Sequence, residues 1–278
     1  MVEVKELEKR AVEIRKRTVE IIYKASGGHI GGSLSSVDIL VALYFGIMNI
    51  DPKNPGMKNR DRFILSKGHS VEGYYSTLEN RGFISAEMLD TYGQFNSPLA
   101  GHPTRKTPGI ELNSGALGHG LSVGVGMAIA AKRSGENFRT YVLMGDGEHG
   151  EGSIMEAAAS AGHYKLNNLV AIIDRNKLQI SGRTEDVCNI NDLEGKYKAC
   201  GWSVVHCDGH NMEALLKCFN DALEQTEKPT FIIAHTVKGK GVSFMEDKAA
   251  WHHKTPTEEQ LNIAFQELDQ RMEELING

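Results

Sequence analysis

The stretch TYVLMGDGEHGEGSIMEAAASAGHYKLNNLVAIIDRNKL, residues 140–178, decides the fold of this chain. Two apolar runs, TYVLM and LVAIID, have the length and character of buried strands, and the alanine-rich segment between them is typical of a helix. A strand, a helix and a second strand in this order predict a βαβ unit with two parallel strands. Asp146 follows the first strand and Asn176 follows the second.

Because the carboxyl ends of parallel strands meet at one edge of a sheet, we expect Asp146 and Asn176 to converge there. A carboxylate and an amide oxygen suit Mg²⁺, which takes one or two protein oxygens and completes its shell with phosphate and water. The glycines beside Asp146 leave room for a diphosphate. The alternative is that Gly-Asp-Gly is a turn and Asn176 a cap; the pairing at this spacing favours the metal site.

The same alternation extends along the chain. Further strands are predicted at RFILS (62–66), WSVVHC (202–207) and TFIIAH (230–235), with a helix in MEALLKCFNDALEQT (212–226). We therefore expect an α/β fold with helices on both faces of a parallel sheet, as one domain over residues 1–278. Amphipathic helices are predicted over residues 3–26 and at the C-terminus, and a more buried helix is expected to start at a capping Ser35.

Composition narrows the class of protein. The 278 residues are 40% hydrophobic and carry a net charge of -5. Because the chain has no excess of basic residues, we do not expect a nucleic-acid partner. No apolar run reaches membrane-spanning length, and the chain opens into a charged helix instead of a signal peptide, which predicts a cytoplasmic protein without membrane contact. The four cysteines lack CxxC pairing and are expected to be reduced packing residues.

GDG followed by EGSIMEAA and by an Asn after the next strand resembles the thiamine diphosphate motif of transketolases, 2-oxo acid dehydrogenases and their relatives. Other segments resemble transketolase in particular, and they occur in family order along nearly the whole chain. They are SGGHIGGSLSSVDILVALYF (26–45), DRFILSKGH (61–69), AGHPTRKTPGIELNSGALGHG (100–120) and HTVKGKGVSFMEDKAAWHHK (235–254).

The resemblance implies that the fold is of the thiamine diphosphate-binding (PP) type, and it implies a role for each matching residue. Asp146, Asn176 and the carbonyl of Leu178 would bind Mg²⁺, for which Ca²⁺ or Mn²⁺ could substitute. His29, His102 and His252 would face the sugar. Thiamine diphosphate would be contacted by His69, Gly115, Ala116, Leu117, Gly147, Asn176, Lys238 and His252. Glu151 matches the interface glutamate through which family members link their paired active sites.

The chemistry of the reaction also favours a catalytic role for the candidate histidines. Carbon–carbon cleavage of a ketose moves protons between hydroxyl and carbonyl oxygens, and imidazoles can carry them. Taken singly, each has a structural alternative: His29 and His102 as loop residues, His69 as a core residue, and Lys238 as part of a solvated basic turn. No matched motif claims six histidines, which we expect to be structural or exposed: His149, His163, His206, His210, His235 and His253.

The resemblance also implies what the chain lacks. In the family, the glutamate that engages the aminopyrimidine ring of the cofactor lies in a second domain, which we expect on a separate chain together with the third domain. We expect two copies of each chain, as α2β2, transferring a two-carbon ketol unit between sugar phosphates of the pentose phosphate pathway. Ala116, His119 and Gly32 depart from the residues usual in many relatives.

Three other interpretations stay open. The chain could be the α subunit of a 2-oxo acid dehydrogenase or the first half of a deoxyxylulose phosphate synthase, although SKGH, AGHPT and the WH ending argue against both. It could be a transketolase for an unusual branched or deoxy sugar phosphate. It could also be a silent cofactor-binding module, which the intact set of candidate residues disfavours.

Overall fold

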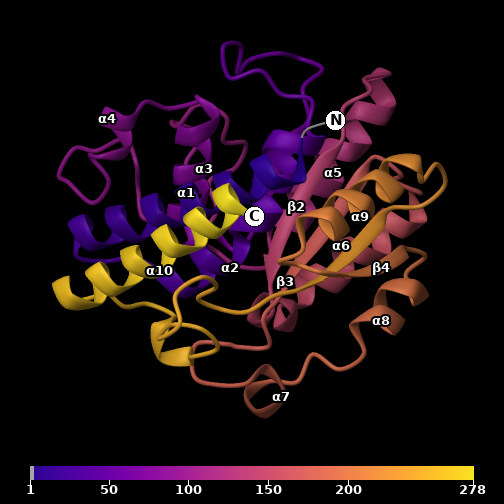
Figure 1. The fold of residues 1–278 in the computed structure, drawn as a ribbon. Helices are drawn as coiled ribbons and strands as arrows, with labels where there is room; N and C mark the ends of the chain where they lie inside the picture. The colour runs from indigo at the N-terminus through magenta and orange to yellow at the C-terminus, as the bar shows by residue number, and fades with distance from the viewer. Residues whose placement is uncertain (1–2) are drawn as a thin grey trace.

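The computed structural model of the chain describes residues 3–278 and contains a five-stranded parallel sheet (Figure 1). Its strands are β1 (Arg62–Leu65), β2 (Thr140–Gly145), β3 (Leu169–Arg175), β4 (Ser203–Asp208) and β5 (Thr230–His235). They lie in the order β1-β2-β3-β5-β4 and every neighbouring pair is parallel. The predicted strands and the α/β fold class are confirmed, and all carboxyl ends meet at one edge.

Helices cover both faces of the sheet because alternate strand residues point in opposite directions. Tyr141 and Leu143 of β2 join a core with α1 (Val4–Ala25), α2 (Ile30–Val41), α3 (Val71–Arg81) and α9 (Met212–Glu224). Val142 and Met144 join a second core with α5 (Gly120–Ser134), α6 (Gly152–His163) and α8 (Leu193–Ala199). Both faces of the strands are therefore apolar, as their continuous apolar runs predict.

The last helix, α10 (Glu258–Asn277), lies beside α1 in Figure 1. It begins with a capping box in which Thr257 and Gln260 each satisfy the other's backbone N–H. Lys16 of α1 reaches Asp269 of α10, with 2.6 Å between Nζ and Oδ1. The expected C-terminal helix is therefore present and docked on the first helix.

The remaining elements are short. They are α4 (Ala86–Leu89), α7 (Thr184–Val187), a π-helical turn (Ala42–Ile47) and three 3₁₀ turns (Gly68–Ser70, Gly147–Gly150, Ala249–Trp251). Between α4 and α5 the chain runs through residues 90–119 without a helix or strand. All four cysteines are unpaired, as predicted.

Helix α2 departs from two expectations. It begins at Ile30, and Ser35 lies inside it instead of capping it. The Ser35 hydroxyl instead donates to the buried Asp174 carboxylate, with 2.6 Å between Oγ and Oδ2. The 18 residues Ile30–Ile47 also have the length and hydropathy of a membrane span, contrary to our expectation, but 83% of them are buried inside the protein. This segment is a core helix.

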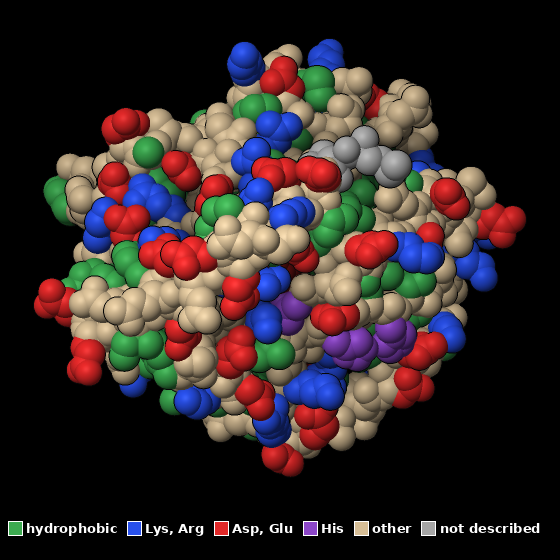
Figure 2. All heavy atoms as spheres, viewed as in Figure 1, with side chains coloured by type: hydrophobic (Ala, Val, Ile, Leu, Met, Phe, Trp, Pro, Cys, Tyr) green, Lys and Arg blue, Asp and Glu red, His purple; other side chains and the backbone are tan. Residues whose placement is uncertain are grey.

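The face drawn in Figure 2 mixes Lys and Arg with Asp and Glu over its whole extent. No broad basic surface gathers on this face, in keeping with the net charge of -5. A nucleic-acid backbone binds through clustered positive charge, which this face lacks.

Candidate active site

A cavity of about 410 Å³ opens at the carboxyl edge of the sheet. It lies where the ends of β2, β3 and β5 meet the turns around His29, His69 and Leu117. Most of the predicted site residues line it, although the loops that carry them are far apart in the sequence. These are His29, His69, Gly115, Leu117, Asp146, Gly147, Asn176, Leu178, Lys238 and His252.

Three predicted residues lie beside the cavity instead of lining it. The His102 ring is 6.1 Å from that of His29, centroid to centroid, and packs over Gly115. Ala116 belongs to the turn between Gly115 and Leu117. Glu151 is exposed at the N-terminus of α6, with its stem against Gly118. Its predicted interface role stays a prediction.

Asp146 and Asn176 lie together, as the βαβ unit predicts, and both are buried. One Asp146 oxygen, Oδ1, is 2.7 Å from Nη1 of Arg175, and the other accepts a hydrogen bond from the Lys177 backbone N–H. Burial raises the pKa of Asp146 to about 6 against the lowering effect of Arg175. Each carboxylate oxygen keeps a further lone pair for a ligand.

The backbone at Lys177 is left-handed, with φ of 62°. This conformation is uncommon outside glycine and recurs at functional sites. Here it turns the Lys177 N–H toward Asp146, while Asn176 and Leu178 on either side both line the cavity. Asn176 Oδ1 also accepts the Leu178 N–H at 3.1 Å, which fixes the amide.

These residues fit a magnesium diphosphate. Within residues 3–278 no three His, Cys, Asp or Glu side chains gather as a metal cage. A single carboxylate, an amide oxygen and a carbonyl are the sparse ligand set of a Mg²⁺ that shares its shell with a phosphorylated ligand.

Five histidines form a cluster at the site. The His29 ring lies at the centre, with centroid distances of 5.3 Å to His69, 5.4 Å to His252 and 4.6 Å to His253. His102 is the fifth member of the cluster. The three residues that we predicted to face the substrate, His29, His102 and His252, all belong to it. His253 was expected to be structural or exposed; it is exposed, but its ring contacts His29. No motif match pointed to it.

Burial and positive neighbours keep the inner imidazoles neutral. Burial first, and His253 next, lower the pKa of His29 to about 4. Burial and the Lys238 ammonium lower the pKa of His252 to about 3, and burial lowers the pKa of Lys238 to about 8. Lys238 Nζ lies 2.9 Å from His252 Nδ1, so a protonated Lys238 donates to a neutral His252.

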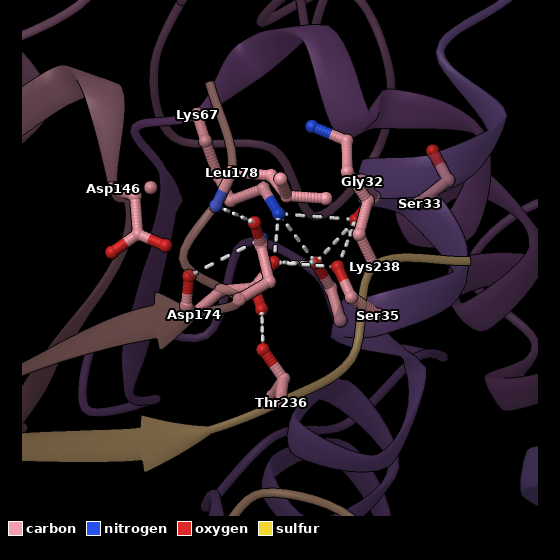
Figure 3. Close-up of polar contacts among 12 residues, drawn as sticks. Gly32, Ser33, Ser35, Lys67, Asp146, Asp174, Leu178, Thr236 and Lys238 are labelled. Atoms are coloured by element: carbon pink, nitrogen blue, oxygen red, sulfur yellow. Dashed lines mark hydrogen bonds and ion pairs between the residues drawn. The ribbon is translucent and has the colours of Figure 1, made fainter. Parts of the chain in front are cut away.

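A buried ion pair at the wall of the cavity, which Lys67 lines, was not predicted from the sequence (Figure 3). Lys67 pairs with Asp174 and also donates to the Gly32 carbonyl at 3.0 Å and to Ser36 Oγ at 2.9 Å. Asp174 accepts further hydrogen bonds from Ser35 and Thr236. The network joins α2 to the ends of β1, β3 and β5. Its signal in the sequence was a charged residue ending the apolar run LVAIID.

Glu148 is a second buried carboxylate that the sequence did not single out. It accepts hydrogen bonds from the Gly118 N–H at 2.9 Å, from the Gly145 N–H at 3.1 Å and from the Ser66 hydroxyl. Burial raises its pKa. Glu148 thereby ties the turn of the GALGHG segment to the loop that carries Asp146.

Residues 7–270 match the family described as transketolase, thiamine diphosphate binding domain. The chain belongs to the transketolase family. It is 55% identical to an apulose-4-phosphate transketolase subunit from Phocaeicola vulgatus over 273 residues, 98% of this chain and 97% of that one. It is 43% identical to a 6-deoxy-6-sulfo-D-fructose transketolase subunit of Clostridium, covering 95% of this chain and 96% of that one.

The structural comparison agrees. Transketolase from Campylobacter jejuni superposes with a TM-score of 0.91 at 32% identity, covering 97% of this chain and 43% of the solved one. The chain thus spans less than half of that transketolase, and 40% of the mouse transketolase to which it is 38% identical. The predicted transketolase subunit with a thiamine diphosphate-binding fold is confirmed.

Proposed function

We propose that this transketolase chain binds thiamine diphosphate and Mg²⁺, with Ca²⁺ or Mn²⁺ as substitutes. With a partner chain it transfers a two-carbon ketol unit from a ketose phosphate to an aldose phosphate. The observation that carries the proposal is the convergence of Asp146, Asn176, Lys238 and the histidine cluster on one cavity. The match over residues 7–270 to a thiamine diphosphate-binding domain supports it.

The cavity divides between two tasks. Asp146, Asn176 and the Leu178 carbonyl hold the metal and, through it, the diphosphate. Gly115, Ala116, Leu117 and Gly147 supply backbone contacts to the cofactor, with His69 beside them. The Lys238 ammonium is buried at the end of β5, where its charge offsets that of the diphosphate. When bound, thiamine diphosphate supplies an electron sink for the carbanion left by carbon–carbon cleavage.

The protein's own residues then bind and deprotonate the sugar. His29 is neutral at physiological pH because its pKa is lowered to about 4, so it can accept a proton from a sugar hydroxyl. His252 is also neutral, because its pKa is lowered to about 3, and it acts as a hydrogen-bond donor. Lys238 donates to His252 Nδ1, which leaves the Nε2–H of that ring free to bind an oxygen. His102 completes the group, with its ring centroid 6.1 Å from that of His29.

The partner in this proposal carries the glutamate that engages the cofactor's aminopyrimidine ring, in an α2β2 assembly. Two relatives that this chain covers almost fully, at 97% and 96%, are themselves named as single subunits of a transketolase. Glu151 is exposed beside the cofactor turn and is available to contact another chain. The four unpaired cysteines support the cytoplasmic location in this proposal.

The test is reconstitution with the partner, thiamine diphosphate and Mg²⁺. Conversion of xylulose 5-phosphate and ribose 5-phosphate to a seven-carbon ketose phosphate, followed by mass spectrometry, is the expected result. Decarboxylation of pyruvate instead would identify a 2-oxo acid enzyme. Absence of cofactor binding by calorimetry, with and without the partner, would identify a silent module.

A second candidate is transfer from an unusual sugar. The relatives at 55% and 43% identity are named for apulose 4-phosphate and for 6-deoxy-6-sulfo-D-fructose. Equimolar competition among these sugars and xylulose 5-phosphate, with the complex limiting, would rank the donors by kcat/KM. Preference for a branched or sulfonated donor would support this candidate, and preference for xylulose 5-phosphate would reject it.

A further inference from the structure

We propose that His253 is a sugar-binding residue at the outer edge of the active site, where it contacts hydroxyls beyond the two carbons that are transferred. The inference rests on the proposed ketol transfer and names a specificity residue for it. Neither the motif match nor the cavity lining assigns His253 a role.

The geometry places His253 next to a substrate-facing ring. Its centroid is 4.6 Å from that of His29, with the planes at 71°, the shortest ring contact that His29 makes in residues 3–278. His253 directly follows His252, which lines the cavity. Among the five histidines of the cluster His253 alone is exposed, so its ring edge is open toward solvent.

The residues on either side of His253 in the sequence keep it at this place. Trp251 is buried in the core shared by α1, α2 and α10, and the Lys254 ammonium lies 4.6 Å from the Trp251 ring centroid. Lys254 is therefore turned back onto the protein, while His253 faces His29. The imidazole is fixed between a buried anchor and the substrate-facing cluster.

The chemistry favours hydroxyls as the ligand. A ketose enters with its reacting carbonyl deepest, so the carbons that remain on the departing aldose extend outward past His29. Imidazole nitrogens donate to and accept from hydroxyls. We therefore assign a sugar hydroxyl as the ligand of His253, and a loss confined to phosphorylated donors would contradict this assignment.

Ketol donors of different length can distinguish a sugar-binding role of His253 from a structural one. Hydroxypyruvate carries the same two-carbon unit but no distal hydroxyls, whereas xylulose has them without phosphate. In the complete complex, His253→Ala is expected to lower kcat/KM about tenfold for both xylulose 5-phosphate and xylulose, mainly through KM, because one hydrogen bond is lost. Hydroxypyruvate should stay within twofold. His253→Asn, which keeps a donor, should recover most of the loss.

Three results would overturn the inference: unchanged kcat/KM with every donor, an equal loss with hydroxypyruvate, or a loss confined to the phosphorylated donor. The control is His163→Ala, an exposed histidine at the end of α6, which should leave all donors unaffected. A wild-type complex that transfers a ketol unit from none of the donors contradicts the proposed function itself. Normal thiamine diphosphate affinity in each variant verifies that the site is intact.

Discussion

His210 hydrogen-bonds Asp38 through Nδ1, at 2.7 Å from Oδ2, while its Nε2 accepts the backbone N–H of Val237 at 2.8 Å. The imidazole is therefore neutral, with its proton on Nδ1. Arg15 contacts both oxygens of Asp38: its Nη2 lies 2.5 Å from Oδ2, which His210 also contacts, and its Nη1 lies 3.1 Å from Oδ1. Val237 immediately precedes Lys238, so this chain of contacts fixes the end of β5 at the point where Lys238 enters the cavity.

Substitutions of His210 should separate its two hydrogen bonds. Glutamine places an acceptor near the position of Nε2 and keeps the bond to Val237, whereas asparagine reproduces only the donor toward Asp38. We expect His210→Asn to weaken thiamine diphosphate binding about tenfold, the size of one hydrogen bond, and His210→Gln to stay within about threefold. Calorimetry on the complex measures both. Equal losses would show that His210 does not act through Val237.

Asp38 predicts a specific pH dependence of stability. Arg15 and His210 lower the pKa of the buried Asp38 carboxyl to about 2 despite the cost of burial. The unfolded chain binds this proton first, so the stabilisation is complete above about pH 4 and is lost as pH falls toward 2. The loss should be about 2 kcal/mol. Urea unfolding measured between about pH 4 and pH 2 should show that the unfolding free energy of Asp38→Asn depends less steeply on pH than that of the wild type. An equally steep dependence would contradict the assignment.

Metal-dependent cofactor binding should require Asp146. Asp146→Ala removes the carboxylate at the end of β2, and we expect Mg²⁺-dependent thiamine diphosphate binding to become undetectable while far-UV circular dichroism is unchanged. The matched control is Glu185→Ala, which removes the more exposed partner of the same Arg175, at 2.5 Å from Nη2. Glu185→Ala should bind normally. Unchanged affinity of Asp146→Ala would refute its role as a metal ligand.

The Lys67–Asp174 pair predicts strong non-additivity. Because both groups are buried, Lys67→Met leaves an uncompensated carboxylate and should cost about 3–5 kcal/mol of unfolding free energy. Adding Asp174→Asn removes that charge, so the double variant should be more stable than Lys67→Met alone. A double-mutant cycle in urea tests this. Additive losses would show that the two side chains are not energetically coupled.

The sequence by itself determined the parallel sheet and the position of the site. Continuous apolar runs specify buried strands, and polar residues directly after them must lie at one edge because parallel strands end together. That local rule is enough to place Asp146, Asn176 and Lys238 around one cavity. The fold and the metal-site candidates depend on short-range pattern, which a sequence displays directly.

Only the tertiary structure decided which distant side chains meet. Ser35 was expected to cap a helix, yet its hydroxyl bonds to Asp174, which is 139 residues away, and the helix starts at Ile30. The pairing of Lys67 with Asp174 and the contact of His253 with His29 arise in the same way. Burial makes such contacts necessary, because polar groups removed from water need partners. Which polar groups become partners depends on how the elements pack in three dimensions, and the spacing of residues along the chain does not show this.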